Sequence, residues 1–536
     1  MYSLKQVTSC ALALAIACLS WPTSAVARPH KCETDKARYI NDSSLLKDAY
    51  DYVIVGGGTS GLTVADRLTE HGKVTVLVIE NGPLHWGCPF SNSRDSDAVT
   101  EVRGGVGAFG SPYFYRIQSA PKPSCTTRRT PVLIGNAVGG SSAVNAMMTL
   151  FRGGGSGRAS LWGGTGAAAF KRGVTFTEPE PAVREKVNIT YDASYWGDTS
   201  PIEAFREIPG VEFPPDSGSG RAGVYWHPSF MDPKKVQRSY ARTGHYDGIN
   251  RTSYDLVYNS KGDQAQYRGS ESNWGSFPND GQKRDSPERR VTLAAGAVHT
   301  PQLLQLSGVG PKTQLEEAGI ETVVDLPGVG QNFQDHPMLG MAIMLRNFTV
   351  HPSPMDLFTN RPYSIGIGNV VAWLGMPVVS PERHETIASR LEAQDHAAYL
   401  PPDTDPTVLA SVLSGSNMPA GMAVHLYPLS RGSVRLNASA PATSEPIVDY
   451  RTLSNPLDVE ILTEFVRFTR AYHFNTSLAA YGPQELMPGS DVTSDEDLAE
   501  FIHRNAGPPF TSGVARPPCC RGSWAASWTR GSRRRI

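Results

Sequence analysis

Three glycines with the spacing G-x-G-x-x-G, Gly56, Gly58 and Gly61, stand directly after a short apolar run, Tyr52 to Val55. In this spacing the first glycine permits a tight turn and the second lets a pyrophosphate approach the backbone. The third lets the following helix pack against the strand. Free amide groups and the dipole at that helix's N-terminus favour an anion. These residues therefore predict a phosphate-binding turn.

Glu80 extends this chemistry from phosphate to ribose. It ends a second apolar run, Val74 to Ile79, about 20 residues after the glycines, where an acidic side chain can accept hydrogen bonds from a ribose diol. A carboxylate there disfavours a 2′-phosphate. The order strand, glycines, helix (Leu62 to Glu70), strand and acid predicts a βαβ unit that binds a dinucleotide. The alternative is a glycine-rich turn without a ligand.

Two further segments predict structure that could lie near a ligand: one is rich in small residues, and the other predicts a strand followed by a helix. Residues 131 to 148 give an apolar run followed by small residues that suit close approach of backbone to a flat ligand; a glycine-rich loop packed on other backbone is the alternative. Val291 to Ala295 predicts another strand. A helix after it has a start signal at Thr300-Pro301 and a stop at Ser307-Gly308.

The second half of the chain has a different pattern. From Met418 onward, M-A-V-H-L-Y-P and G-S-V-R-L-N predict strands of an antiparallel sheet, and Asp458 to Tyr472 predicts an amphipathic helix. Before it, the loop of residues 325 to 337 ends in Asp335, His336 and Pro337. A histidine in such a loop is more often structural than catalytic.

The composition bounds the class of protein. With 536 residues, 40% of them hydrophobic, the chain can bury a large core and form two or more domains. Fifty Lys and Arg against 51 Asp and Glu leave a formal charge of -1, so no overall charge favours nucleic acid or an anionic membrane. After the first 27 residues, no run is long and apolar enough for a transmembrane helix.

The N-terminus predicts secretion. Lys5, the short apolar stretch Cys10 to Leu19 and the small residues Ala25 to Ala27 have the pattern of a signal peptide, residues 1 to 27; a buried N-terminal helix is the alternative. N-glycosylation sequons are compatible with this route. They begin at Asn41, Asn188, Asn250, Asn347, Asn437 and Asn475. The remaining cysteines lack metal-ligand spacing.

Four separated segments, in this order, resemble the glucose-methanol-choline (GMC) oxidoreductase family of flavoproteins. Residues 51 to 80 are similar to its FAD-binding unit, Gly135 to Asn145 to its first signature, and Gly296 to Gly310 to its second. Pro327 to Pro337 is similar to the loop after the second signature, and Pro428 to Leu436 to the start of the substrate-domain sheet. Within the family, G-G-G-T-S-G-L-T-V-A-D-R-L-T-E most resembles the secreted fungal secondary-metabolite branch, which includes patulin synthase and the versicolorin B synthase type of cyclase.

The resemblance implies an α/β fold, with a Rossmann-type FAD-binding domain and an α+β substrate domain built on an antiparallel sheet. It divides the chain into a signal peptide (1–27), a discontinuous FAD-binding domain (50–150 and 285–340), a substrate-binding domain with connecting segments (151–284 and 341–510) and an aberrant tail (511–536).

The chemistry that the resemblance implies is removal of a hydride from the CH–OH carbon of a small alcohol to flavin N5, with oxygen or another acceptor reoxidising the flavin. Thr59 and Ser60 would contact the pyrophosphate, Glu80 the ribose, and Asn145 to Met148 the flavin side; His336 would support the cofactor and not act as the base. The implied cofactor-binding residues are Gly56, Gly58, Thr59, Ser60, Gly61, Glu80, Asn81, Gly139, Gly140, Asn145, Ala146, Met147 and Met148. Neither a metal nor nucleic acid is implied.

The chain departs from the family where the base is expected. The family places a catalytic histidine in an H-P-x-G-T motif after a segment like Asn505 to Phe510, but here a Cys-, Trp- and Arg-rich tail follows and that histidine is absent near residue 513. With suitable synonymous third bases, codons for Ala515 to Ser532 read in another frame give T-A-A-M-L-P-R-E-L-G-G-V-V-D-P-G-L, which resembles the family's continuation. We therefore expect the tail to reflect a frameshift or a misplaced splice junction, so that Cys519 and Cys520 have no redox role.

Two internal stretches also differ from the family. Residues 153 to 170 replace a helical region, and residues 253 to 290 lack clear strand pairs. Three functions remain open on the sequence: an FAD-dependent alcohol dehydrogenase or oxidase, a cyclase on the same fold without net redox, and a flavin-binding protein that is catalytically impaired because it lacks the base.

Overall fold

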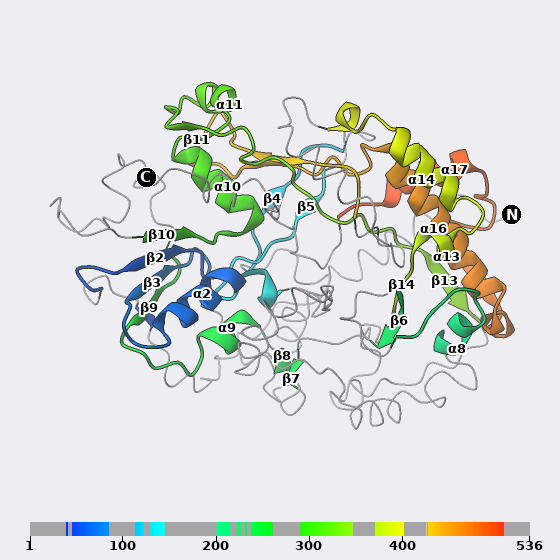
Figure 1. Ribbon diagram of the computed structural model, residues 1–536, viewed down its shortest axis with the longest axis horizontal. Coiled ribbons are helices and arrows are strands. Elements are labelled where there is room, and N and C mark those ends of the chain that lie inside the picture. The colour runs from blue at the N-terminus through cyan, green and yellow to red at the C-terminus, as the bar shows by residue number, and fades with distance from the viewer. Residues whose placement is uncertain are drawn as a thin grey trace, which may run out of the picture.

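The computed structural model describes about half of the chain. The described residues are 39–40, 46–84, 113–122, 129–144, 201–214, 222–226, 231–232, 237–238, 240–260, 290–346, 370–400, 425 and 427–508. The expected signal peptide, the stretch 153–170, Asn145 to Met148 and the tail from 511 lie outside these ranges. In Figure 1 a parallel sheet with helix α2 (Thr59–Thr69) forms one end of the molecule, and a group of helices forms the other.

A five-stranded parallel sheet is built around the glycine turn. Its strand order is β1 (Tyr39–Ile40), β9 (Tyr254–Val257), β3 (Val76–Ile79), β2 (Tyr52–Val55) and β10 (Arg290–Leu293). All four residues of β3 are buried, as is typical of parallel strands that are covered on both faces. The predicted strands before and after the glycines are confirmed.

Strand β9 corrects the expectation that residues 253 to 290 would lack strand pairs. The sequence of β9, Y-D-L-V, has an acidic residue in its middle, which hides the apolar pattern. Asp255 is fully buried, and its carboxylate accepts a hydrogen bond from Tyr50 Oη (2.8 Å) and pairs with Lys47. A buried charge with such partners is compatible with a central strand.

The helices follow the sequence pattern with shifted starts. Helix α2 begins at Thr59, three residues before the expected start. Helix α10 (Gly296–Leu306) begins four residues before Thr300, because Gly296, with φ of +80°, turns the chain directly from β10 into the helix. The stop at Ser307 is confirmed, and the predicted helix at 458–472 is α16 (Pro456–Phe474).

The remaining strands form pairs, all antiparallel except β11 with β12. They are β4 (Ile117–Gln118) with β5 (Pro131–Val132), β6 (Gly223–Trp226) with β14 (Val370–Trp373), β7 (Met231–Asp232) with β8 (Gln237–Arg238), β11 (Val309–Gly310) with β12 (Val324–Asp325), β13 (Ala342–Leu345) with β17 (Pro483–Met487), and β15 (Ser433–Arg435) with β16 (Ile447–Asp449). Strand β15 confirms the prediction for G-S-V-R-L-N. In M-A-V-H-L-Y-P only His425, Tyr427 and Pro428 are described, and none of them lies in a strand.

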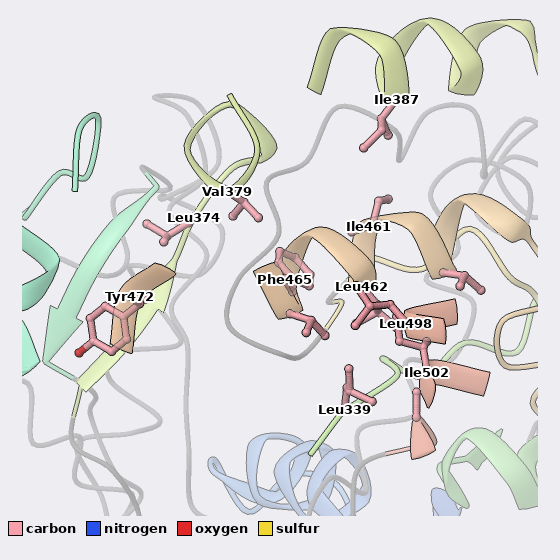
Figure 2. Packing of buried hydrophobic residues seen from close by; sticks show 14 of the residues in the cluster. Leu339, Leu374, Val379, Ile387, Ile461, Leu462, Phe465, Tyr472, Leu498 and Ile502 are labelled. Carbon is pink, nitrogen blue, oxygen red and sulfur yellow. The ribbon is translucent and has the colours of Figure 1, made fainter. Parts of the chain in front are cut away.

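Helix α16 is the centre of a hydrophobic core that is separate from the parallel sheet and is shown in Figure 2. Its apolar residues Ile461, Leu462 and Phe465 recur every three or four positions and pack with Leu498 and Ile502 of α17 (Asp495–Asn505). Other helices around this core or elsewhere in the described chain are α8 (Pro201–Arg206), α9 (Ala241–His245), α11 (Lys312–Glu317), α13 (Met376–Val379), α14 (His384–Ala393), η3 (Gly140–Ala143), η6 (His396–Tyr399) and η7 (Ser477–Tyr481). No helix in the described ranges has the length and apolar character needed to cross a membrane.

Glu464 joins α16 to the corner between α13 and α14, and this predicts a measurable stability effect. Its buried carboxylate accepts hydrogen bonds from Ser380 (2.7 Å), Arg383 (2.8 Å) and Arg467 (2.6 Å). We expect Glu464→Ala to lower the free energy of unfolding by about 2 kcal/mol, because it leaves the buried hydroxyl of Ser380 unpaired and removes a shared partner of Arg383 and Arg467.

The matched control lies one turn earlier on α16. Glu460 pairs with Arg390, which is 53% exposed, so Glu460→Ala should cost about 0.5 kcal/mol or less. Urea unfolding of both variants checks the pair. Equal destabilisation by the two substitutions would show that burial of Glu464 adds nothing.

Candidate cofactor site

The turn after β2 is closed by contacts that only glycine allows. Gly56 has φ of +107°, and a Cβ there would overlap the carbonyl oxygen of Ala294 and lie 2.8 Å from Ala295 N. A Cβ on Gly61 would overlap the carbonyl oxygen of Gly56. The first turn of α2 therefore sits directly on the strand end, as the glycine spacing predicts.

The second glycine segment lies on this turn. Gly139 N donates to the Gly57 carbonyl (2.8 Å), and Gly140, with φ of +56°, lies so close that its Cβ would be 2.9 Å from Gly58 Cα. The structure thus brings together Gly58 and the pair Gly139–Gly140, about 80 positions apart in the sequence.

The start of α2 is open to an anion. Its N-cap, Gly58, provides no side-chain hydrogen bond, and Thr59 and Ser60 are exposed. Among the described residues, a Cβ on Gly58 would meet no atom closer than 3.7 Å, so this part of the polypeptide leaves space next to Gly58. The free amide groups of the first turn can therefore bind a phosphate.

Glu80 is hydrogen-bonded to the backbone of the glycine turn. Its buried carboxylate accepts hydrogen bonds from Gly57 N through Oε2 and from Gly82 N through Oε1, both at 2.7 Å. Burial raises the pKa of Glu80 to about 7, although the backbone donors oppose this shift. Each oxygen has a further lone pair that can accept from a ribose hydroxyl.

The raised pKa of Glu80 predicts a pH dependence of stability without cofactor. A carboxyl whose pKa is higher in the folded state than in the unfolded state, here about 7 against 4.5, stabilises most below pH 4.5. This contribution, about 3 kcal/mol, is lost as the pH rises through about 7. Urea unfolding of the wild type should lose this amount between pH 4 and 8 relative to Glu80→Gln. A difference between the two proteins that does not change with pH would contradict it.

Asn81 is held by the protein on its amide side. Its Nδ2 donates to Tyr115 Oη (3.1 Å) and to Asn136 Oδ1 (3.0 Å), so its own carbonyl oxygen is the atom left for a ligand. Tyr115 packs on His299, in the first turn of α10, with ring centroids 4.3 Å apart. Tyr115, Asn136 and His299 could not be predicted as neighbours of this site, because no spacing rule relates them.

His336 lies near the end of the loop of residues 325 to 337. Its Nδ1 is 3.5 Å from the buried carboxylate of Asp335, and its backbone N donates to that carboxylate (2.9 Å). Burial raises the pKa of Asp335 well above its usual value. Phe333 of the same loop packs with Val298 of α10. The supporting role of His336 stays a prediction.

The predicted residues that the structure describes converge on one place. Gly56, Gly58, Thr59, Ser60, Gly61, Glu80, Asn81, Gly139 and Gly140 surround the turn between β2 and α2. Asn145, Ala146, Met147 and Met148 lie outside the described residues. Within the described ranges, no cluster of His, Cys, Asp and Glu could hold a metal ion.

We call the turn between β2 and α2, together with Gly139, Gly140 and Glu80, the cradle. A parallel sheet with this cradle at the carboxyl ends of its strands defines a Rossmann-like dinucleotide-binding protein. A model of the NAD(P)-binding Rossmann-like domain matches residues 54–117, and one of GMC oxidoreductases matches residues 274–338. The chain is 30% identical to dehydrogenase xptC of Emericella nidulans, over 87% of this chain and 84% of that one. The chain belongs to the GMC oxidoreductase family.

Solved structures agree with this assignment. An FAD-dependent oxidoreductase from Chaetomium thermophilum is similar with a TM-score of 0.67 and 30% identity, and a fungal aryl-alcohol oxidase with 0.66 and 31%; each match covers 86% of this chain and 88% of the other. These relatives imply FAD. The cradle fits its pyrophosphate and ribose, because Gly58 leaves the space that a side chain would fill and Glu80 offers acceptors.

Proposed function

We propose that this protein is an FAD-dependent oxidoreductase that acts on the CH–OH group of a small secondary-metabolite alcohol. The observation that carries the proposal is the junction of Gly58 with Gly139–Gly140 above the buried carboxylate of Glu80. Bound there, FAD would supply the acceptor for a hydride. The similarity to a fungal aryl-alcohol oxidase supports an alcohol substrate and oxygen as the final acceptor.

The residues of this chain have separate tasks in that reaction. The amides at the start of α2, around Thr59 and Ser60, would hold the pyrophosphate, and Glu80 would orient the adenosine ribose. By resemblance, Asn145 to Met148 would face the flavin. A group of the protein must also take the hydroxyl proton of the alcohol. The residue that does so in the family is absent from this tail.

We also propose that the protein is secreted and N-glycosylated, with residues 1–27 removed. Two sequon asparagines, Asn250 and Asn475, are exposed in the structure, and Asn437 is half-buried. Exposed positions can carry a glycan without disturbing the core, which supports the proposal. A mass shift on deglycosylation of the secreted protein tests it.

FAD binding is the direct test of the proposed function. The purified protein should carry a yellow flavin spectrum or acquire one when FAD is added. Under anaerobic conditions an aryl alcohol should bleach it, and oxygen should restore it. Failure to bind FAD would overturn the proposal; formation of a cyclised product without bleaching would favour the cyclase.

A further inference from the structure

Helix α9 lies beside α2 and contacts two separate parts of the cradle (Figure 1). On α2, the carboxylate Oδ2 of Asp66 is 3.1 Å from Nδ1 of His245, the last residue of α9. At the other end of α9, the ring of Tyr240 lies against Gly139, where an added Cβ would be 2.8 Å from ring atom Cδ2. Helix α9 therefore connects α2 with the pair Gly139–Gly140.

The hydroxyl of Ser142, in η3, links this glycine pair to α9 by hydrogen bonds. Its Oγ donates to the carbonyl oxygen of Gly139 (2.6 Å) and accepts from the backbone N of Ala241 (3.1 Å), which lies 99 positions later in the chain. The amides in the first turn of a helix have no partner within the helix, so the Ser142 hydroxyl satisfies one of them. A single side chain thus ties the backbone of Gly139 to the start of α9.

The position of Gly139–Gly140 determines the shape of the cradle. Both residues have positive φ, +102° and +56°, in a region where glycine has great conformational freedom. The Gly139 carbonyl that Ser142 holds belongs to the peptide plane between the two glycines, and this plane is rigid. Gly140, on the other side of that plane, lies so close to Gly58 that its Cβ would be 2.9 Å from Gly58 Cα. Rotation of this plane would therefore move the backbone that borders Gly58.

We infer that Ser142 is a positioning residue for the pyrophosphate of a bound dinucleotide. Its hydroxyl fixes the Gly139–Gly140 peptide against α9 and so keeps this part of the cradle beside Gly58. Without the hydroxyl, a smaller fraction of the apo-protein has the cradle in its binding shape, and the apparent affinity falls by that fraction. The inference rests on the proposed binding of FAD and adds to it a residue that acts through the backbone.

FAD titration of the full-length apo-protein, followed by flavin fluorescence, tests the inference. We expect Ser142→Ala to bind FAD about tenfold more weakly, as it would if about a tenth of the molecules kept the binding shape. Ser119→Ala is the matched control, because the Ser119 hydroxyl also donates to a backbone carbonyl, that of Ala120 (2.9 Å), and accepts from a backbone N, that of Thr130 (3.0 Å). It joins the ends of β4 and β5 instead. The control should bind FAD like the wild type, although the melting temperature of its apo-protein should fall at least as much.

A second titration uses ADP, which has the pyrophosphate without the flavin, and Ser142→Ala should lose the same factor for it. A loss for FAD alone would overturn the inference, since the effect would then lie at the flavin. Unchanged FAD affinity in Ser142→Ala, or an equal loss in Ser119→Ala, would overturn it too. Ser142→Thr keeps the hydroxyl and should recover most of the affinity; a Thr variant as weak as the Ala variant would contradict a role of the hydroxyl.

The proposed function and the inference can fail separately. A wild type that binds ADP but no FAD would overturn the proposed function, and the ADP comparison would still decide the inference. A wild type that binds neither molecule would overturn both. If Ser142→Ala does not fold, Ser142→Cys takes its place, because a thiol is a weaker donor and acceptor than a hydroxyl.

Discussion

Gly61→Ala should abolish FAD retention and lower the free energy of unfolding by about 3 kcal/mol. The added Cβ would overlap the Gly56 carbonyl oxygen, which belongs to backbone and cannot rotate away. Helix α2 would have to move off the end of β2, although Leu62 and Ala65 of that helix are fully buried against the sheet. The same movement would separate the first-turn amides of α2 from the cradle. Thermal unfolding and the flavin content of the purified variant measure both effects.

Substitutions at two other glycines distinguish an effect on folding from an effect on FAD binding. Gly72 has φ of +66°, and no atom of the described chain lies within 4 Å of an added Cβ there. Gly72→Ala should therefore cost only about 1 kcal/mol from the backbone and leave FAD binding intact. At Gly58, with φ of -80°, the polypeptide tolerates a Cβ, but the methyl group would stand in the cradle. Gly58→Ala should therefore fold normally and bind FAD weakly. If Gly61→Ala behaved like Gly72→Ala, the packing argument for the turn would be wrong.

The parts of the fold that the sequence predicted are those set by local pattern. Strands β2 and β3 are short apolar runs beside glycines, and α16 shows its period over 19 residues. Strand β9 was missed because Asp255 is buried by partners, Tyr50 and Lys47, that lie about 200 positions away. Long-range pairing of this kind leaves no trace in the local pattern.

The same division holds for the candidate site. The spacing of Gly56, Gly58 and Gly61 reports a local turn and was sufficient to predict it. The contact of Gly140 with Gly58 was not predictable from spacing, because it joins separate segments through backbone packing. The place of His299 could not be predicted either, because its contacts with Gln302 and Tyr115 arise only in the folded chain.

Hydrogen bonds fix the end of the described chain, from His503 to Gly507, in place. Met338 and Gly507 exchange two backbone hydrogen bonds (2.8 and 3.1 Å), which join the segment to the His336 loop. Lys122 Nζ donates to the carbonyls of His503 (2.6 Å) and Ala506 (3.0 Å) at the end of α17. A cation there is favoured by the helix dipole. The chain is thus held in place up to Gly507, shortly before the position where the family has its base.

Restoring the tail should therefore restore proton transfer. We expect a chain whose residues from 513 onward are replaced by H-P-V-G followed by T-A-A-M-L-P-R-E-L-G-G-V-V-D-P-G-L to reduce its flavin about 10²- to 10⁴-fold faster with an aryl alcohol, because a positioned base contributes this factor. The measurement is anaerobic stopped-flow bleaching at saturating alcohol. The restored tail with alanine in place of its histidine is the matched control, since it keeps the added chain and removes only the base. Equal rates for this control and the histidine tail would assign the gain to folding, and equal rates for the present and restored chains would show that another group already takes the proton.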